Sequence, residues 1–400
     1  MKNVDNKKCL CVSGAVVSML AFSSMTVADE SHSQPVKDSF TSYPMAYMTL
    51  PESDTKTVNL ALLIEPTYRN SKDNSAGKLE NDFSFDRLRF GFYGSLDKKI
   101  DYFLVTELAP NAITNKSGSG AKAFIGMLTF KDIDLLGGAN VAVGSMAIPM
   151  GYSFYAPSQL SPWISYADVE YNLYGCGSIN CFAEADMPRN FFTNIWKPGV
   201  MVFDQIHLSK DSSVTYTAGL FNTTGTLFTD NAVESKDFNG SVEYHNKNVK
   251  LMYGTRIGAS KDVAAWSDPR DRTRHALTFM YNDYRSAPWW IWAEYMRGTD
   301  EQAVGVSDVT ADGYFIGAGY KFAPKWEAVV RHSEFNRNVD VSGQSRTMDS
   351  VGVSYKMDNG VKVMAEQTFV DDKNINYTGI IYPDDTFFFR VSMPFNAKIL

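Results

Sequence analysis

The sequence is short of histidine, cysteine and positive charge, and these shortages exclude several classes of protein. Five His residues are scattered along the 400-residue chain, so no metal site is expected. Lys and Arg number 38 against 45 Asp and Glu, which leaves too little positive charge for the basic face of a nucleic-acid binder. Charged residues make up 21% of the chain, too many for a bundle of membrane helices. The hydrolase motifs Gly-x-Ser-x-Gly and His-Glu-x-x-His are also missing, and we expect neither an enzyme nor a bound cofactor.

The first 28 residues have the features of an export signal. A start with three Lys residues precedes the uncharged run Cys9–Ala28, which ends in small residues. We therefore expect a signal peptide over residues 1–28, cleaved before Asp29. A retained membrane anchor is the alternative, but four Ser residues dilute the run. The polar residues 29–56 are expected to form a periplasmic lead-in, and residues 57–400 the folded domain.

Cys176 and Cys181 are the two cysteines of the expected mature chain, and they are separated by four residues. An exported chain meets oxidising conditions, so a disulfide that closes a small loop is the simplest interpretation. A structural metal site is the alternative, but it would need two further ligands nearby.

Hydrophobic and polar residues alternate with a period of two, in runs of about ten residues. Val351 and Val353, for example, alternate with Ser350 and Ser354. Such runs indicate strands with one apolar and one polar face. We expect sixteen, which begin near Val58, Phe83, Ile100, Ala121, Ala139, Pro198, Ser213, Phe238, Val249, Thr273, Pro288, Gly313, Lys325, Met348, Val361 and Asp385.

The connections between these runs alternate between short and long. A soluble sandwich has no reason to sort them in this way, whereas a membrane barrel has short periplasmic turns and long outer loops. In lipid every backbone amide needs a partner, and a sheet provides this only by closing on itself. We therefore predict an all-β fold, a transmembrane antiparallel β-barrel of about 16 strands in the cell outer membrane of a Gram-negative bacterium. A soluble secreted β-protein is the alternative.

The connection from Gly151 to Lys197, the third long one, is about three times as long as its neighbours. We predict that this extracellular loop folds into the lumen and constricts it. The alternative is an external loop that covers the mouth or meets a neighbouring subunit. Acidic residues of this loop outnumber Arg189 and Lys197; they are Asp168, Glu170, Glu184 and Asp186.

Sixteen strands enclose a lumen wide enough for water, so we expect a porin for passive diffusion of small hydrophilic solutes and ions. A structural or adhesive barrel with a plugged lumen is the alternative. If the apolar faces of the strands meet lipid, more bases than acids point into the lumen; the inward acids are Glu107, Glu243, Glu327 and Glu366. This excess of positive charge predicts a mild preference for anions, and phosphate is among the candidate anions. Alternatively, these bases pair with the acids of the wall. The predicted pore-lining residues are Arg87, Arg89, Arg189, Lys250, Arg256, Arg274, Arg331, Lys356, Lys362 and Arg390.

Three stretches share the motifs of one family. Residues 87–94 are Arg-Leu-Arg-Phe-Gly-Phe-Tyr-Gly, residues 143–151 are Val-Gly-Ser-Met-Ala-Ile-Pro-Met-Gly, and Arg189-Asn190 is followed by Gly-Val-Met-Val-Phe at 199–203. In that order they resemble an early strand, the strand before the constriction loop and the end of that loop in the phosphate-selective porin O and P family of Gram-negative outer membranes. The resemblance implies a sixteen-stranded porin that is usually trimeric. Unlike the family pattern, residues 145–151 contain no base.

The expected partners follow from this interpretation. They are outer-membrane lipid, small hydrophilic solutes or ions and, by the resemblance, further copies of the chain in a homotrimer, without nucleic acid. Aromatic residues near strand ends, such as Tyr320, Trp326 and Tyr355, are expected at the membrane interfaces. Phe395 is followed by five more residues, which we expect to form a short periplasmic tail.

Overall fold

The computed structural model describes residues 49–50, 55–73, 78–109, 122–153, 161–165, 167, 196–222, 236–260, 270–301, 308–372 and 385–400. No helix in these ranges is long and apolar enough to cross a membrane. A 3₁₀ helix, η2 (Asp134–Leu136), lies between the fourth and fifth strands. The strands are β1 (Asn59–Asp73), β2 (Lys78–Asp97), β3 (Ile100–Glu107), β4 (Lys122–Ile133), β5 (Ala139–Ala147), β6 (Trp196–Ser209), β7 (Ser212–Asn222), β8 (Lys236–Asn246), β9 (Val249–Ser260), β10 (Arg270–Tyr281), β11 (Trp289–Asp300), β12 (Val309–Ala323), β13 (Trp326–Asn336), β14 (Ser345–Lys356), β15 (Lys362–Asp372) and β16 (Thr386–Lys398).

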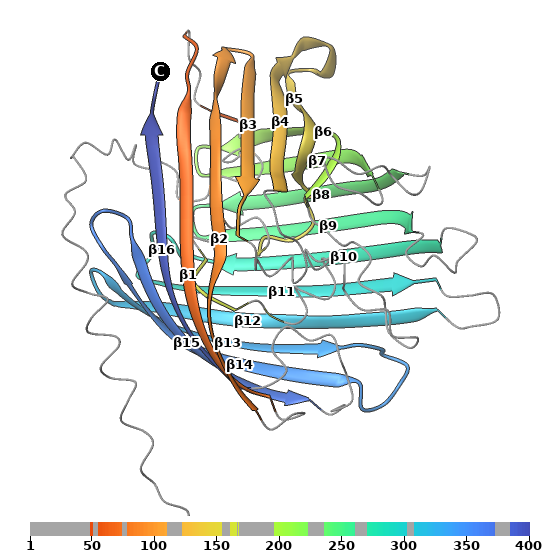
Figure 1. The fold of residues 1–400 in the computed structure, drawn as a ribbon. Coiled ribbons are helices and arrows are strands. Elements are labelled where there is room, and N and C mark those ends of the chain that lie inside the picture. Colours follow the sequence, from red (N-terminus) through yellow and green to blue (C-terminus); the bar gives the residue numbers. More distant parts are fainter. Residues whose placement is uncertain are drawn as a thin grey trace, which may run out of the picture. The chain divides into compact units, whose positions relative to one another are not determined.

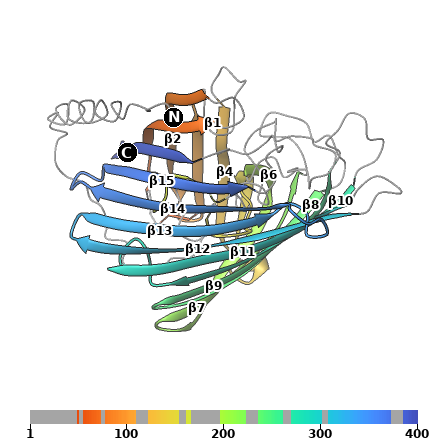
Figure 2. The same cartoon turned by 90° about the horizontal axis from the view of Figure 1, so that it is seen from below.

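The sixteen strands form one closed antiparallel barrel in chain order, because β16 pairs with β1. At this seam the register runs from Asn59 opposite Lys398 to Ser71 opposite Thr386. Figure 1 shows β16, β1 and β2 side by side, and Figure 2 shows the wall turned by 90°. Closure gives every strand a partner on both edges, which a sheet needs in order to cross hydrocarbon. The prediction of a sixteen-stranded antiparallel barrel is confirmed.

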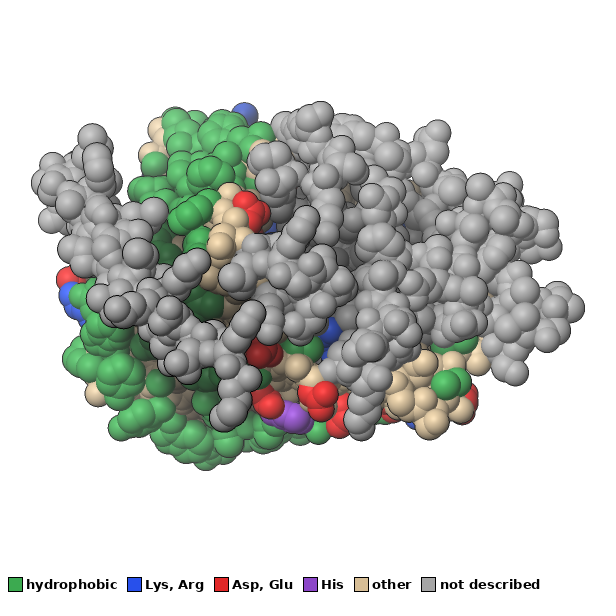
Figure 3. Space-filling model, turned by 60° about the horizontal axis from the view of Figure 1, so that its bottom comes forward, with side chains coloured by type: hydrophobic (Ala, Val, Ile, Leu, Met, Phe, Trp, Pro, Cys, Tyr) green, Lys and Arg blue, Asp and Glu red, His purple; other side chains and the backbone are tan. Residues whose placement is uncertain are grey.

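The two faces of the wall differ as the alternation predicts. On β14, Val351 and Val353 are 48% and 37% exposed, whereas Ser350 and Ser354 on either side of them are buried. Figure 3 shows hydrophobic side chains gathered on the outer surface of the wall. An apolar outer face is what lipid requires of a barrel.

Aromatic side chains form a row on the outer face at the end of the barrel where the short turns lie. Trp326 packs against Tyr355 with ring centroids 4.8 Å apart, and Trp289 stacks on Tyr281 at 5.3 Å. Trp289 also lies opposite Tyr320 in the register of β11 and β12. Such a row is typical of the membrane–water interface, where amphipathic rings are stable.

Some strands are longer than the sequence pattern predicts. β1 and β2 remain paired from Glu65 and Arg87 out to Asp73 and Lys78, beyond the apolar stretch that marked them, because a hairpin continues to pair where both faces are polar. The predicted tail after Phe395 is wrong: β16 continues to Lys398, and the Val58 N–H donates to the Leu400 carbonyl at 3.0 Å. Backbone pairing with the first strand makes this polar end a strand.

A β-bulge at the closing seam changes which side chains face inward. The register of β1 with β2 shifts between Glu65 and Pro66, so that Asp86 is an extra residue on β2. Proline has no N–H for the ladder, and a bulge is where a strand tolerates it. As a result the consecutive residues Asp86 and Arg87 are both buried.

Part of the predicted lead-in contacts the wall near the short-turn end. The Leu50 N–H donates to the Asp101 carboxylate at 2.7 Å, and Lys131 Nζ donates to the Leu50 carbonyl at 3.3 Å. Lys131 and Asp101 also form an ion pair at 3.1 Å, and both are buried. The predicted signal peptide and most of the lead-in lie outside the described residues.

A charge on the outer face should destabilise the barrel. Val351→Arg places a guanidinium in the apolar band between Val330 and Gln367, its neighbours in the register. We expect a loss of about 2–4 kcal/mol in the free energy of unfolding, measured by urea titration in lipid vesicles. Ser354→Arg, on the inner face of the same strand, is the control, and an equal loss in both variants would contradict the assignment of faces.

Candidate functional site in the barrel lumen

Most predicted pore-lining arginines form ion pairs with carboxylates of the same wall. Arg87 lies 2.8 Å from Glu65, Arg89 lies 2.9 Å from Glu107, and Arg274 lies 2.6 Å from Asp300. Arg256 pairs with Asp237 in the same way. These pairs neutralise most of the charge that the arginines bring to the inner face.

The closing seam carries the densest of these networks. Asp86 accepts hydrogen bonds from Arg390 and from Arg69, the latter at 2.5 Å. Arg390 also donates to the Thr67 hydroxyl at 3.1 Å, and Glu65 accepts from the Ser392 hydroxyl at 2.7 Å. The network joins β16, β1 and β2 across the place where the sheet closes.

Sequence reasoning missed several of the acids that pair with the inward bases. Asp237 and Asp300 are buried residues near the ends of β8 and β11, and they are not among the inward acids that the sequence predicted. Asp86 is the extra residue of the bulge and Glu65 lies beside it, so a strict period of two is interrupted here. An opposite charge on a nearby strand was a signal in each case, but it could be used only once the register was known.

Lys250 contacts both the wall and the segment that follows β5. Its ammonium lies 3.4 Å from the Glu243 carboxylate and 4.0 Å from the centre of the Tyr152 ring. Burial raises the pKa of the Tyr152 phenol well above its usual range. The phenol therefore stays neutral and offers the face of its ring to the cation.

A group of lysines, Lys321, Lys356 and Lys362, lines the inner face near the short turns, with Glu327 and Asp283 among the nearby acids. Lys356 and Lys362 are direct neighbours across β14 and β15. Lys362 donates to the Ser161 carbonyl at 2.9 Å, and Lys321 donates to the Arg285 carbonyl at 3.0 Å. Carbonyl acceptors do not cancel the charge of an ammonium. This group therefore keeps net positive charge on the lumen wall.

Beyond Tyr152, the segment after β5 also contacts the inner face at β11. The Ser153 N–H donates to the Glu294 carboxylate at 2.7 Å, and the Trp292 indole N–H donates to the same oxygen at 2.9 Å. Both Glu294 and Trp292 are inward-facing, buried residues. The wall thus holds the beginning of the long connection by its backbone.

The segment meets the wall again at residues 161–165. Glu366 of β15 accepts the Ile164 N–H at 2.5 Å, the Ser165 N–H at 3.3 Å and the Ser165 hydroxyl. Arg331 of β13 donates to the Ser165 carbonyl at 3.1 Å and to its hydroxyl at 2.6 Å. Arg331, one of the predicted pore-lining bases, therefore binds protein rather than open lumen.

Large apolar side chains also face inward, which the sequence analysis did not anticipate. Trp290, Trp292 and Phe315 are buried on the inner face of β11 and β12 and pack around Trp163 of the long connection. The signal was the run from Trp289 to Ala293, in which apolar residues follow one another without alternation. Such a run predicts a strand that is apolar on both faces.

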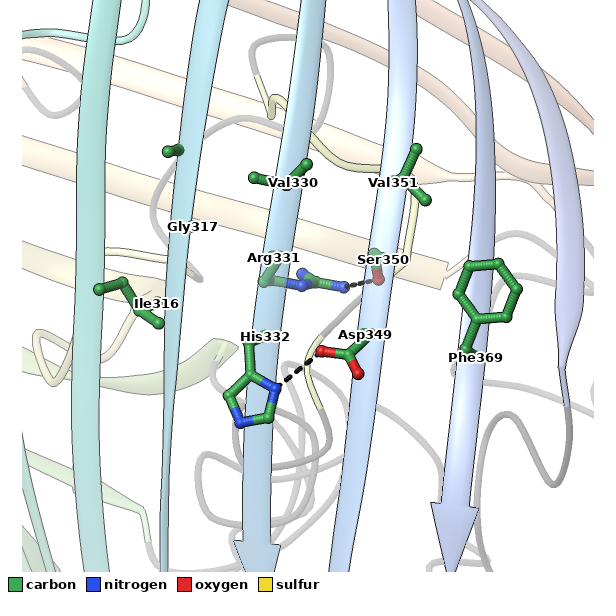
Figure 4. A pocket seen from close by; sticks show the side chains of 10 residues that line it. Ile316, Gly317, Val330, Arg331, His332, Asp349, Ser350, Val351 and Phe369 are labelled. Carbon is green, nitrogen blue, oxygen red and sulfur yellow. Dashed lines mark hydrogen bonds and ion pairs between the residues drawn. The ribbon is translucent and has the colours of Figure 1, made fainter.

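Neighbouring residues on β13 and β14 show how thin the wall is. Figure 4 shows Arg331 directed toward Ser350 and the adjacent His332 directed toward Asp349. His332 and Asp349 belong to the outer face, where Val330 and Val351 line a shallow hollow of about 460 Å³. The lumen and the lipid side are separated here by one layer of backbone.

The remaining predicted site residues are placed as follows. Lys356 is exposed at the end of β14, and Lys197 is a buried residue of β6 rather than part of the loop. The others lie outside the described residues; they are Arg189, the four loop acids Asp168, Glu170, Glu184 and Asp186, and the predicted disulfide of Cys176 with Cys181.

Known structures share this barrel. An anion-selective porin from Comamonas acidovorans matches with a TM-score of 0.63 at 13% identity, over 86% of this chain and 100% of that chain. The outer-membrane channel DcaP of Acinetobacter baumannii matches with a TM-score of 0.54 at 11% identity, over 86% of this chain and 99% of that chain. OmpF of Salmonella typhi, in complex with daunomycin, matches with a TM-score of 0.55 at 10% identity, over 86% of this chain and 98% of that chain. At these identities the similarity shows a shared fold.

The comparison of sequences identifies the family, whereas the structural comparison shows only the fold. No curated protein matches the chain. The family model of phosphate-selective porin O and P matches residues 64–378, from the first strand to the last long connection. The matched range includes the arginine pairs of Arg87, Arg89, Arg256 and Arg274, the lysine group and the wall contacts of the segment after β5. The chain therefore belongs to the phosphate-selective porin O and P family.

Proposed function

We propose that this porin is a passive channel with a mild preference for anions, narrowed by the segment between β5 and β6. The family and the barrel make the protein an outer-membrane channel for solutes and ions. Passive diffusion needs no catalytic group, so we propose a transport role without enzymatic activity.

The lysine group is the observation that carries the anion preference. The arginines at Arg87, Arg89 and Arg274 each lie beside a carboxylate, so they add little net potential. Lys321, Lys356 and Lys362 lie near Glu327 and Asp283, and Asp283 is already paired with Arg285 at 2.7 Å, so the bases outnumber the acids in this part of the described wall. Walls of low dielectric constant focus the field of such unbalanced charge into the lumen.

Phosphate remains a candidate among small anions, but we propose no special site for it. Residues 145–151, which lead into the long connection, contain no base. A lysine is a point charge that attracts anions of many shapes, whereas arginine forks recognise phosphate oxygens in pairs. Most arginines of this wall already bind carboxylates, and Arg331 binds Ser165 of the long connection. General anion preference fits these residues better than phosphate selectivity.

Backbone contacts support a narrowed lumen. Ser153, Ile164 and Ser165 of the long connection each bind inward-facing carboxylates, those of Glu294 and Glu366. A loop that only covered the outer mouth would not reach side chains in the middle of β11 and β15. The described part of this segment therefore favours a position inside the barrel.

The assembly and processing of the protein are part of the proposal. We propose that residues 1–28 are a signal peptide, that residues 29–56 lie on the periplasmic side, and that the barrel spans lipid from residue 57 onward. OmpT of Vibrio cholerae, a match at TM-score 0.58 and 12% identity, is described in a trimer form. We propose a homotrimer for this chain as well.

The experiment that tests the function is a reversal potential in a planar bilayer under a KCl gradient. Purified, detergent-folded protein should give the sign of an anion-preferring channel. The triple variant Lys321→Glu, Lys356→Glu and Lys362→Glu should shift the potential to the cation-preferring sign, because it removes the unbalanced positive charge.

A matched control changes three lysines of exposed turns, Lys210→Glu, Lys247→Glu and Lys325→Glu, and should shift the potential much less. A cation-preferring wild type would contradict the anion preference. Protein that folds but never conducts would contradict the channel and favour a structural or adhesive barrel. Block of chloride current by phosphate at low concentration would contradict the lack of a phosphate site.

A further inference from the structure

We infer that Trp163 docks in a socket of the inner wall, and that Gly317 and Glu366 are positioning residues that hold the long connection and so set the bore of the channel. This inference rests on the proposed narrowing of the lumen. It assigns that narrowing to a fixed contact with the wall, made by residues far apart in the sequence.

The socket consists of aromatic rings on two neighbouring strands. Trp163 is 3% exposed, and its ring centroid lies 5.4 Å from Trp290, 5.3 Å from Trp292 and 5.8 Å from Phe315. The Arg331 guanidinium lies 5.0 Å from the same ring. Tilted and edge-on aromatic pairs of this kind add to the free energy of burial. The indole is thus held on several sides by the wall.

Gly317 provides the floor of the socket. A Cβ atom built at this position on β12 would overlap the Trp163 Cζ2 atom and would lie 2.8 Å from Cη2. Because real Cβ atoms do not approach so closely, any other residue here must displace the indole. The glycine is therefore required by the docked loop, since a strand by itself would be more stable with a larger residue.

Glu366 fixes the backbone beside the socket. Its carboxylate accepts two backbone N–H groups and the Ser165 hydroxyl, and it is buried. Arg331 lies 3.8 Å from Glu366 and donates to the Ser165 carbonyl. Glu366 and Arg331 therefore bind the N–H groups and a carbonyl group of the same peptide segment. Lys362 adds a hydrogen bond to the Ser161 carbonyl at 2.9 Å. The ring and the backbone of residues 161–165 are consequently held together.

A pair of alanine substitutions, one on β12 and one on β14, tests the socket. Gly317→Ala should displace Trp163 and raise the single-channel conductance by about twofold, because the current depends on the narrowest point. Gly352→Ala is the control: its Cβ would meet only wall atoms, with Val329 Cγ2 nearest at 3.0 Å. The control should conduct as the wild type does. Unheated electrophoretic mobility reports whether each barrel is folded.

Variants of Trp163 show whether Gly317→Ala acts by displacing the long connection or by disturbing the wall in general. Trp163→Ala should raise the conductance as Gly317→Ala does, and the double variant should raise it no further, since the new methyl group then meets no indole. Trp163→Phe should keep most of the wild-type behaviour, because the buried indole N–H has no hydrogen-bond partner in the described structure. Glu366→Gln should also raise the conductance, by loss of the backbone clamp.

The outcomes distinguish this inference from the proposed function. If Gly317→Ala raises the conductance equally with and without Trp163, the socket does not position the loop and the inference is wrong. Unchanged conductance in folded Gly317→Ala and Trp163→Ala would overturn it too, while leaving the channel itself intact. Wild-type protein that does not conduct would instead refute the channel.

Discussion

Deletion of residues 160–184 is expected to raise the single-channel conductance by about twofold or more, because it removes the part of the long connection that is docked on the wall. The deletion takes away Trp163 together with the peptide groups that Glu366 and Arg331 hold. About twenty residues would still join β5 to β6, enough to span the gap without strain. The measurement is the conductance of single channels in a planar bilayer at fixed KCl concentration.

Deletion of residues 374–383, in the connection between β15 and β16, is the control. It shortens another long connection and leaves residues 161–165 and their contacts with the wall in place. We expect its conductance to equal that of the wild type. An equal rise in both deletions would mean that loop length in general limits the current, and an unchanged conductance after deletion of 160–184 would place the constriction elsewhere.

Asp86→Ala is expected to lower the free energy of unfolding by about 3–5 kcal/mol, the usual cost of removing one partner of a buried ion pair. Asp86 is the acceptor for both Arg69 and Arg390, and Arg390 is buried at the closing seam. Without the carboxylate, the guanidinium of Arg390 would remain in the wall without this counter-charge. Urea titration of the folded barrel in lipid vesicles gives the free energy.

The control for this prediction is an exposed pair of similar geometry. Lys325 and Asp358 lie 2.6 Å apart in neighbouring short turns, with side chains 40% and 86% exposed. Asp358→Ala should cost far less than Asp86→Ala, because water already screens this pair. In addition, Asp86→Leu combined with Arg390→Met should recover much of the loss. Equal effects of Asp86→Ala and Asp358→Ala would show that the seam network does not stabilise the barrel.

The strand pattern could be predicted from the sequence because it reflects a local rule. Adjacent side chains of a strand point to opposite faces, so a strand between lipid and water must alternate, as Val351 and Ser350 do. The starts of β3, β5 and β9 were predicted at the residue where they occur. Where both faces are polar, as at Asp73 and Lys78, the rule gives no contrast and the strands were predicted too short. From Trp289 to Ala293 both faces are apolar; the strand itself was predicted, but its inward-facing tryptophans were not.

The sequence by itself determined the barrel, its strand number and which face meets lipid, since each of these depends on periodicity within a strand. Only the tertiary structure decided what the inner face does. The pairing of Arg390 with Asp86, the bulge that turns Asp86 inward, and the packing of Trp163 over Gly317 join residues that are hundreds of positions apart or lie on different strands. These contacts depend on the register of the strands and on the closing of the sheet, and neither is encoded in the local alternation of side chains.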